Sequence, residues 1–142
     1  MTLVELTAFH ADIVVELHRT SFEENWSAKA FAELITLPAS FGFLALKDDQ
    51  PVGFILCQGD AIEAEIITIA THPAARRTGI AGQLVTNIGT KTQRLFLEVA
   101  EDNPAALAFY TQFGFTKVGR RKNYYKHHNR DDVDALVMEK SF

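Results

Sequence analysis

Residues 66–88 constrain the fold of this chain more than any other segment. An apolar run over residues 66–70 predicts a strand, and residues 83–88 predict a helix. The connection between them contains two arginines and several small residues. Because the N–H groups at a helix N-terminus are unpaired and carry the positive end of the helix dipole, this arrangement predicts an anion-binding loop.

The spacing of small residues distinguishes this loop from other phosphate-binding loops. A P-loop ends in Gly-Lys-Ser/Thr, and a Rossmann loop has three glycines with an acidic residue about 20 positions later, and neither pattern is present. Gly79, Ala81 and Gly82 are small enough for a phosphate to approach the backbone. The alternative is an ordinary strand-to-helix turn with a solvated pair of arginines.

Arg76-x-x-Gly79-x-Ala81 follows the pattern (Gln/Arg)-x-x-Gly-x-(Gly/Ala). It resembles the loop with which the GCN5-related N-acetyltransferases (GNAT) hold the pyrophosphate of acetyl-coenzyme A. That resemblance implies acetyl-coenzyme A as the co-substrate.

Length and composition predict a single domain spanning residues 1–142. Apolar residues make up 47% of the chain and include eleven phenylalanines, enough for a sizeable core. No apolar run approaches the ~20 residues of a membrane span, and the first residues lack a signal-peptide pattern. Cys57 lies in an apolar run, so we expect a core thiol rather than a nucleophile. These features predict a cytoplasmic protein.

Charge is unevenly distributed, although the formal net charge is only −4. Up to Glu65 there are eleven acidic and three basic residues, whereas residues 117–130 contain six Lys or Arg and no acid. The net acidity disfavours general nucleic-acid binding. The basic run either meets a phosphate, of coenzyme or of RNA, or guards a solvated strand edge.

Periodicity and turn signals give the order β-α-α-β-β-β-α-β-α-β-β. Expected strands cover residues 3–6, 41–46, 52–58, 63–71, 94–100, 116–125 and 133–142. Expected helices cover residues 8–20, 28–37 and 81–88, with a fourth running from an Asn103 N-cap to Gly114. This order predicts an α/β domain with a mixed central sheet of about seven strands and helices on both faces, which is also the order of the GNAT fold.

Two side chains in the second half are candidates for acid–base chemistry. Strand alternation places Glu98 on one face with Phe96, in a run that is otherwise apolar. Burial would favour a general base, and the alternative is a structural ion pair with an arginine or lysine. Tyr110, on the helix opened by Asn103, could reach the same cleft, and its alternative role is a core aromatic.

The segment Leu97-Glu98-Val99-x-x-x-Asn103-x-x-Ala106-x-x-x-Tyr110-x-x-x-Gly114-Phe115 resembles the bacterial ribosomal-protein alanine N-acetyltransferases, a branch of the GNAT superfamily. Further similarities are Trp26-Ser27, Asn123-Tyr124-Tyr125 and Asp134-Ala135-x-x-Met138. The resemblance implies that Glu98 takes the proton from the acceptor amine and that Tyr110 protonates the leaving thiolate. It also implies a set of coenzyme-binding residues: Ile69, Ala70, Thr71, Arg76, Arg77, Thr78, Gly79, Ile80, Ala81, Gly82 and Asn103.

The predicted function is transfer of an acetyl group to a primary amine, foremost the N-terminal α-amine of a protein or peptide. The acidic segment Ala100-Glu101-Asp102 departs from the branch and favours a cationic acceptor. The alternatives are a small-amine acetyltransferase, for a polyamine, amino acid or aminoglycoside, and a non-catalytic coenzyme-binding module. We expect no membrane partner and a monomer or weak homodimer.

No metal is required by this chemistry. His127-His128 lie near Asp131-Asp132, which could suggest a ligand set, but this segment is predicted to be a polar turn between the last two strands. Tyr124 and Tyr125 could flank a peptide N-terminus, or they could pack as ordinary strand residues.

Overall fold

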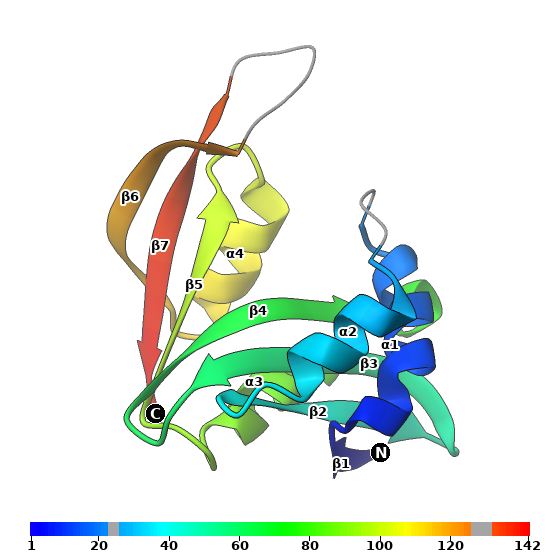
Figure 1. The fold of residues 1–142 in the computed structure, drawn as a ribbon. Coiled ribbons are helices and arrows are strands. Elements are labelled where there is room, and N and C mark those ends of the chain that lie inside the picture. The colour runs from blue at the N-terminus through cyan, green and yellow to red at the C-terminus, as the bar shows by residue number, and fades with distance from the viewer. Residues whose placement is uncertain (23–25, 126–131) are drawn as a thin grey trace.

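The computed structural model describes residues 1–22, 26–125 and 132–142, except for the side chains of Asn123 and Tyr125. The strands are β1 (Thr2–Glu5), β2 (Ser40–Lys47), β3 (Gln50–Gly59), β4 (Glu63–Thr71), β5 (Arg94–Ala100), β6 (Thr116–Tyr125) and β7 (Val133–Ser141). The helices are α1 (Ala11–Arg19), α2 (Ala28–Ile35), α3 (Ile80–Ile88) and α4 (Pro104–Gln112), with single 3₁₀ turns η1 (Ala8–His10) and η2 (Pro73–Ala75). Figure 1 shows their arrangement.

The strands form one seven-stranded sheet in the order β1-β2-β3-β4-β5-β7-β6. Neighbouring strands are antiparallel except for β4 and β5, which are parallel and pair only over Glu63–Glu65 and Arg94–Phe96. Beyond these residues β4 and β5 diverge, and the sheet opens between them (Figure 1). The mixed sheet predicted from the sequence is confirmed, and its split is the feature that positions the site.

Two apolar clusters cover the two faces of the sheet, because successive strand residues point to opposite sides. On one face, here the α1–α2 face, Val14 and Phe31 pack on Leu44 and Phe54. On the other, the α3–α4 face, Leu84 of α3 packs with strand residues such as Ile55, and Leu107 of α4 lies against the same cluster. Cys57 is buried in this second cluster, as expected for a core thiol.

Two helices differ from their predicted extents. The helix expected over residues 8–20 begins as the 3₁₀ turn η1, where the Thr7 N–H donates to Nδ1 of His10 at 3.0 Å, and continues as α1. Helix α2 starts after its predicted N-cap, Ser27, whose hydroxyl accepts from the Ala30 N–H at 3.1 Å. It ends two residues early because the Thr36 hydroxyl donates to the helix carbonyls of Ala32 and Glu33.

The basic segment of the sequence lies largely on β6, the edge strand next to β7. Arg120 of β6 pairs with Glu101 and Asp134, and its neighbour Arg121 pairs with Glu98. These pairs support the interpretation of a guarded strand edge. The sequence also predicts a turn at residues 24–27. The first two residues of this turn, the His127–His128 segment and Asp131 lie outside the described residues. No helix in the described part of the chain is long and apolar enough to cross a membrane.

Candidate active site

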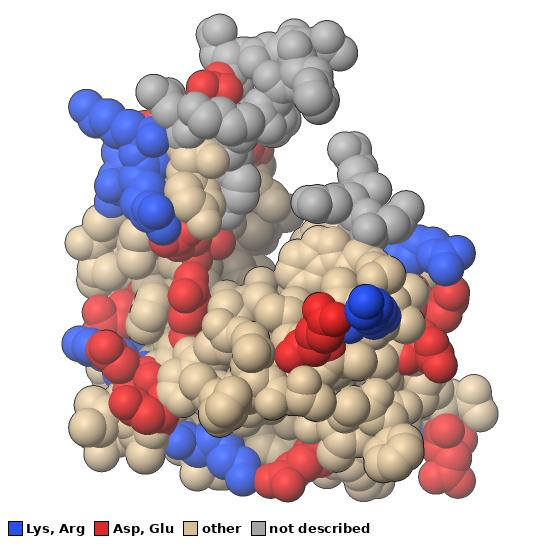
Figure 2. Space-filling view, viewed as in Figure 1, with Lys and Arg blue, Asp and Glu red and all other residues tan. Residues whose placement is uncertain are grey.

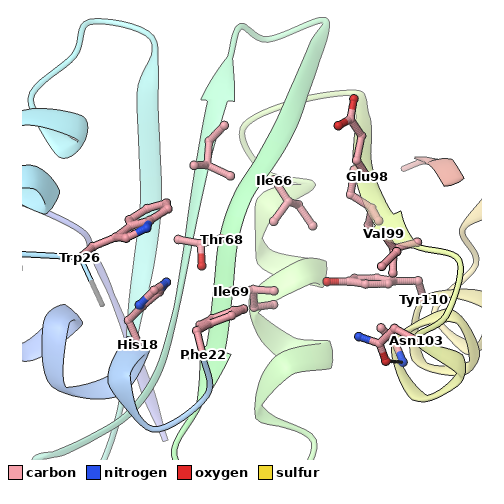
Figure 3. Close-up of a pocket in the computed structure, with 14 residues that line it drawn as sticks. His18, Phe22, Trp26, Ile66, Thr68, Ile69, Glu98, Val99, Asn103 and Tyr110 are labelled. Carbon is pink, nitrogen blue, oxygen red and sulfur yellow. Dashed lines mark hydrogen bonds between the residues drawn. The ribbon is translucent and has the colours of Figure 1, made fainter. Parts of the chain in front are cut away.

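The split between β4 and β5 holds a pocket of about 470 Å³ (Figure 3). Its lining comes from four elements that lie far apart in the sequence. Residues 66–69 of β4 and 97–100 of β5 form two sides, and α4 and the segment after α1 close the others. Figure 2 shows the same face hollowed between the β5–β7 strands and the α1–α2 helices.

The split leaves backbone groups of β4 unpaired by β5. On the other edge of β4, the His72 N–H donates to the Val52 carbonyl at 2.8 Å. Because antiparallel pairing alternates along a strand, the Ala70 N–H also faces β3, and the N–H groups of Ile69 and Thr71 face the open side. Ile69 lines the pocket, whereas Ala70 and Thr71 are not among its lining residues.

Glu98 stands on the β5 side of the pocket and faces the α1–α2 side of the sheet. Its neighbours Leu97 and Val99 point into the opposite cluster, as the alternation predicted. The Glu98 side chain is 15% exposed, and its Oε1 accepts from Nη1 of Arg121 at 2.6 Å. The ion pair considered from the sequence is therefore present, formed with a residue of β6 whose own side chain is 55% exposed.

Tyr124 also contacts this carboxylate. A hydrogen bond from its phenol to Glu98, reinforced by the negative charge of Glu98, raises the pKa of Tyr124. The Arg121 guanidinium lies 4.4 Å from the centre of the Tyr124 ring. Glu98 is thus held by two partners from the edge strand, which the sequence alone did not identify.

Glu65 is a second carboxylate beside Glu98 that the sequence analysis missed. Burial raises the pKa of Glu65, the negative charge of Glu98 raises it further, and Arg121 acts in the opposite direction. The signal in the sequence was an acidic residue two positions after Glu63, inside the otherwise largely apolar strand 63–71. Two carboxylates and one guanidinium therefore interact electrostatically beside Glu98.

Helix α4 supplies Tyr110 and Asn103 from the other side of the pocket. Asn103 is the predicted N-cap, since its Oδ1 accepts from the Ala106 N–H at 3.1 Å, and Pro104 follows at the first helical position. The half-buried Tyr110 ring packs edge-on against Phe115, with 5.4 Å between ring centres. Figure 3 shows its hydroxyl directed toward Ile69 across the pocket. Tyr110 is therefore both a core aromatic and a pocket residue.

The predicted anion-binding loop ends at the N-terminus of α3. Gly79 is its N-cap with φ +83°, and a Cβ added there would meet no atom within 4 Å. Arg77 also has a left-handed backbone, with φ +64°, which is uncommon for a residue other than glycine. The Thr78 hydroxyl donates to the Ala75 carbonyl and fixes the turn. The open space at Gly79 therefore lies next to the first N–H groups of α3, which have no partner within the helix.

Three residues of this loop have structural roles that the sequence did not indicate. A Cβ on Gly82 would lie 2.4 Å from the Phe113 ring, so packing against that ring also requires a small residue there. Ile80 is buried, and only its backbone faces the loop. Arg76 donates to the Thr20 carbonyl at 3.4 Å and to the Ser21 hydroxyl at 3.2 Å, which ties the loop to the end of α1.

The α1 side of the pocket consists of residues that the sequence did not assign to it. His18, only 3% exposed, stacks on Phe22 and Trp26 with ring centres 4.4 and 4.9 Å apart. Thr68 of β4 lies beside them (Figure 3). Trp26 was noted only as part of a motif, and no local signal could place His18 or Thr68 here. The structure describes no group of three His, Cys, Asp or Glu residues suited to a metal ion.

The fold therefore combines a split mixed sheet, a pocket at the split and a loop predicted to bind an anion at the start of α3. The chain belongs to the acetyltransferase (GNAT) family, whose family model matches residues 11–115. It is an N-acetyltransferase, as its named relatives are, and that family uses acetyl-coenzyme A.

The similar proteins include the [ribosomal protein bS18]-alanine N-acetyltransferase of Haemophilus influenzae, 31% identical over 89% of this chain and 96% of that protein. The N-alpha-acetyltransferase RimI of Mycobacterium tuberculosis is 30% identical over 99% of this chain and 92% of that protein. The predicted family and branch are thereby confirmed.

Solved structures agree with the fold. The ribosomal-protein-S18-alanine N-acetyltransferase from Escherichia coli superposes with a TM-score of 0.86 at 25% identity, over 99% of this chain and 92% of that one. A spermidine N-acetyltransferase from Vibrio cholerae gives a TM-score of 0.79 at 19% identity, over 99% and 95% of the two chains. The second likeness shows the fold alone, so the fold does not choose between peptide and small-amine acceptors.

Proposed function

We propose that this protein acetylates the N-terminal α-amine of a protein or peptide, with Glu98 as the general base and Tyr110 as the general acid. The observation that carries the proposal is the position of Glu98. Its carboxylate is mostly buried, lines the pocket, and lies across the split from β4. The identity to ribosomal-protein alanine N-acetyltransferases supports a peptide N-terminus with a small first residue.

An ammonium group is not a nucleophile, so the reaction needs a base at the amine. In the proposal, Glu98 accepts a proton from the acceptor ammonium, directly or through water, and the resulting amine attacks the acetyl carbonyl. The N–H groups of Ile69 and Thr71, which face the split, are suited to stabilise negative charge on that carbonyl oxygen. No covalent bond to the enzyme is needed.

The acetyl donor fits the other features of the site. Acetyl-coenzyme A supplies an activated acetyl group and a thiolate leaving group. The N–H groups of Ile80, Ala81 and Gly82, with Arg77 beside them, would hold its pyrophosphate. The open edge of β4 at residues 69–71 and the amide of Asn103 would hold its extended arm, and Tyr110 would return a proton to the thiolate.

Arg121 must give way for this chemistry, because it occupies the carboxylate that the acceptor ammonium would approach. An ion pair with a guanidinium that is 55% exposed is easily displaced, since solvent screens it and ordering of the long side chain opposes it. The acceptor ammonium would replace the Arg121 guanidinium, so the carboxylate of Glu98 would exchange one cation for another.

The two halves of this ion pair give a matched test. Glu98→Gln and Arg121→Gln both break the pair, but only Glu98→Gln removes the base. We expect Glu98→Gln to lower kcat by about 10²–10⁴-fold, and Arg121→Gln to retain turnover within about tenfold. Turnover is measured by thiol release with a short Ala-starting basic peptide, and acetyl-coenzyme A binding by calorimetry should be nearly unchanged in both variants. Equal losses in the two variants would mean that Glu98 is a structural partner only.

A small polyvalent amine is the second candidate acceptor. The specific observation in its favour is that the pocket residue Glu98 is coupled electrostatically to a second carboxylate, Glu65. A panel of diamines, polyamines and amino acids run beside the peptide distinguishes the candidates. Turnover on small amines alone would support the proposed mechanism but show that the acceptor is a small amine and not a peptide.

A further inference from the structure

Thr68 has a hydroxyl that is buried without a partner. The residue is 7% exposed, and among the described residues its Oγ1 has no hydrogen-bond partner. Leaving a buried hydroxyl unsatisfied costs about 1–3 kcal/mol, so such a group calls for an explanation. Valine has almost the same shape without this cost, and the neighbouring strand positions are isoleucines.

The hydroxyl lies in the pocket rather than in the closed core. Thr68 lines the same pocket as Glu98 and Tyr110. Figure 3 shows the Thr68 oxygen directed into the space between His18 and Ile69, above Phe22. The stack of His18, Phe22 and Trp26 forms a largely apolar wall beside it. A group that enters this end of the pocket would meet one polar atom on an apolar surface.

The side of the sheet indicates which substrate would supply that group. Ala70 packs on the α1–α2 face, and Thr68, two residues earlier, points to the same face. Glu98 points to this face as well, whereas Tyr110 packs against the opposite cluster. Thr68 therefore lies on the same side as the proposed base, which is the side that receives the amine.

The depth of Thr68 restricts the group further. A peptide acceptor must continue out of the pocket through its backbone carbonyl to reach solvent. The part that ends inside, next to the amine, is the side chain of its first residue. A small side chain with one hydroxyl would both fit the space and satisfy the oxygen of Thr68, which can donate or accept.

We propose that Thr68 is a specificity-determining residue that selects acceptors whose first residue is serine over those that begin with alanine. This inference rests on the proposed function and specifies its acceptor. One neutral hydrogen bond gives a preference of about fivefold to tenfold in kcat/KM.

The test compares two peptides that differ only in the first residue, Ser or Ala, with the full chain and its Thr68→Val and Thr68→Ser variants. We expect the unmodified protein to favour the Ser peptide by about fivefold to tenfold. Thr68→Val should lower kcat/KM for the Ser peptide alone and bring the ratio near one, and Thr68→Ser should keep the preference. The melting temperature of Thr68→Val should be equal or higher, because an unsatisfied hydroxyl is removed.

Each other outcome has a defined meaning. Equal turnover of both peptides by the unmodified protein, or a Ser preference that survives in Thr68→Val, would overturn the role of Thr68 and leave the proposed function intact. Absence of transfer to either peptide, with transfer to a small amine, would overturn both. If Thr68→Val lowered kcat/KM for the Ala peptide as much as for the Ser peptide, Thr68 would have a packing role instead.

Discussion

At the scale of single residues, the site depends on charges that the fold brings together. Glu98 and Arg121 are 23 residues apart in the sequence and join at 2.6 Å. Glu65 comes from a third strand, and the charges of Glu98 and Arg121 both shift its pKa, in opposite directions. The carboxylate proposed as the base therefore has its electrostatic surroundings set by β4 and β6, neither of which is its own strand.

Glu65 gives a prediction for stability against pH. Its pKa is raised in the folded protein, so the folded state binds a proton more tightly than the unfolded chain does. The contribution of Glu65 to stability therefore falls as pH rises from its ordinary pKa through the raised one. Because Glu65 is partly exposed, solvent weakens the effect, and we expect Glu65→Gln to raise the melting temperature by about 1–2 °C at pH 7.

Thermal unfolding followed by circular dichroism at pH 7 and near pH 4 measures this difference. The gain should shrink at the lower pH, where Glu65 is mostly protonated in both states. Glu33→Gln is the matched control, since Glu33 is an exposed carboxylate 4.0 Å from Lys29. A lower melting temperature for Glu65→Gln at pH 7 would show that the attraction of Glu65 to Arg121 outweighs its burial and its repulsion by Glu98.

At the scale of elements, helix α4 shows how one side chain can serve both fold and site. Asn103 uses its oxygen to cap the helix, which leaves its Nδ2 group as the donor for the proposed contact with the coenzyme arm. The loop before α3 separates these roles instead. Gly79 faces open space with a left-handed backbone, and Gly82 faces the Phe113 ring. Similar small residues, three positions apart, are thus needed for different reasons.

Asn103 can be tested with a pair of variants that divides its two roles. Asn103→Asp keeps an N-cap oxygen and loses the amide N–H, so stability should be unchanged while acetyl-coenzyme A binds several-fold more weakly. Asn103→Ala loses both and should cost a further ~1 kcal/mol of stability. Urea unfolding and calorimetric titration measure the two effects. Unchanged coenzyme affinity in both variants would restrict Asn103 to capping.

At the scale of the whole molecule, the seven strands form one sheet, but the hydrogen-bonded pairing between β4 and β5 is short. β1 to β4 form one antiparallel set, β5 to β7 form another, and three register pairs join them. The pocket lies where that pairing stops, so a ligand in the split would bridge the two halves. The oligomeric state, monomer or weak homodimer, stays a prediction.

Cys57 can report the opening of the whole molecule. It is fully buried in β3, and burial raises the pKa of its thiol well above the ordinary value. We expect no alkylation by iodoacetamide in the folded state beyond the rate of unfolding. Acetyl-coenzyme A at about 100 times its Kd should slow alkylation by about 100-fold, because it binds the folded state alone.

Mass spectrometry of the alkylated peptide follows the reaction. A urea-unfolded sample gives the intrinsic rate of the thiol as the control. Rapid alkylation of the folded protein would show that β3 opens locally, without global unfolding.

The sequence by itself determined the order of the elements, the mixed sheet, the caps at Ser27 and Asn103, and the face of β5 that bears Glu98. These features follow from local periodicity and turn chemistry, which act over a few residues. Only the tertiary structure decided the partners of Glu98, the packing role of Gly82 and the tether from Arg76. It alone placed Thr68 beside His18. Such contacts join residues that are 23 to 56 positions apart along the chain, as Glu98 with Arg121 and Arg76 with Thr20 show. No local pattern encodes them, because the direction of each strand and its neighbour in the sheet are fixed only when the whole core packs.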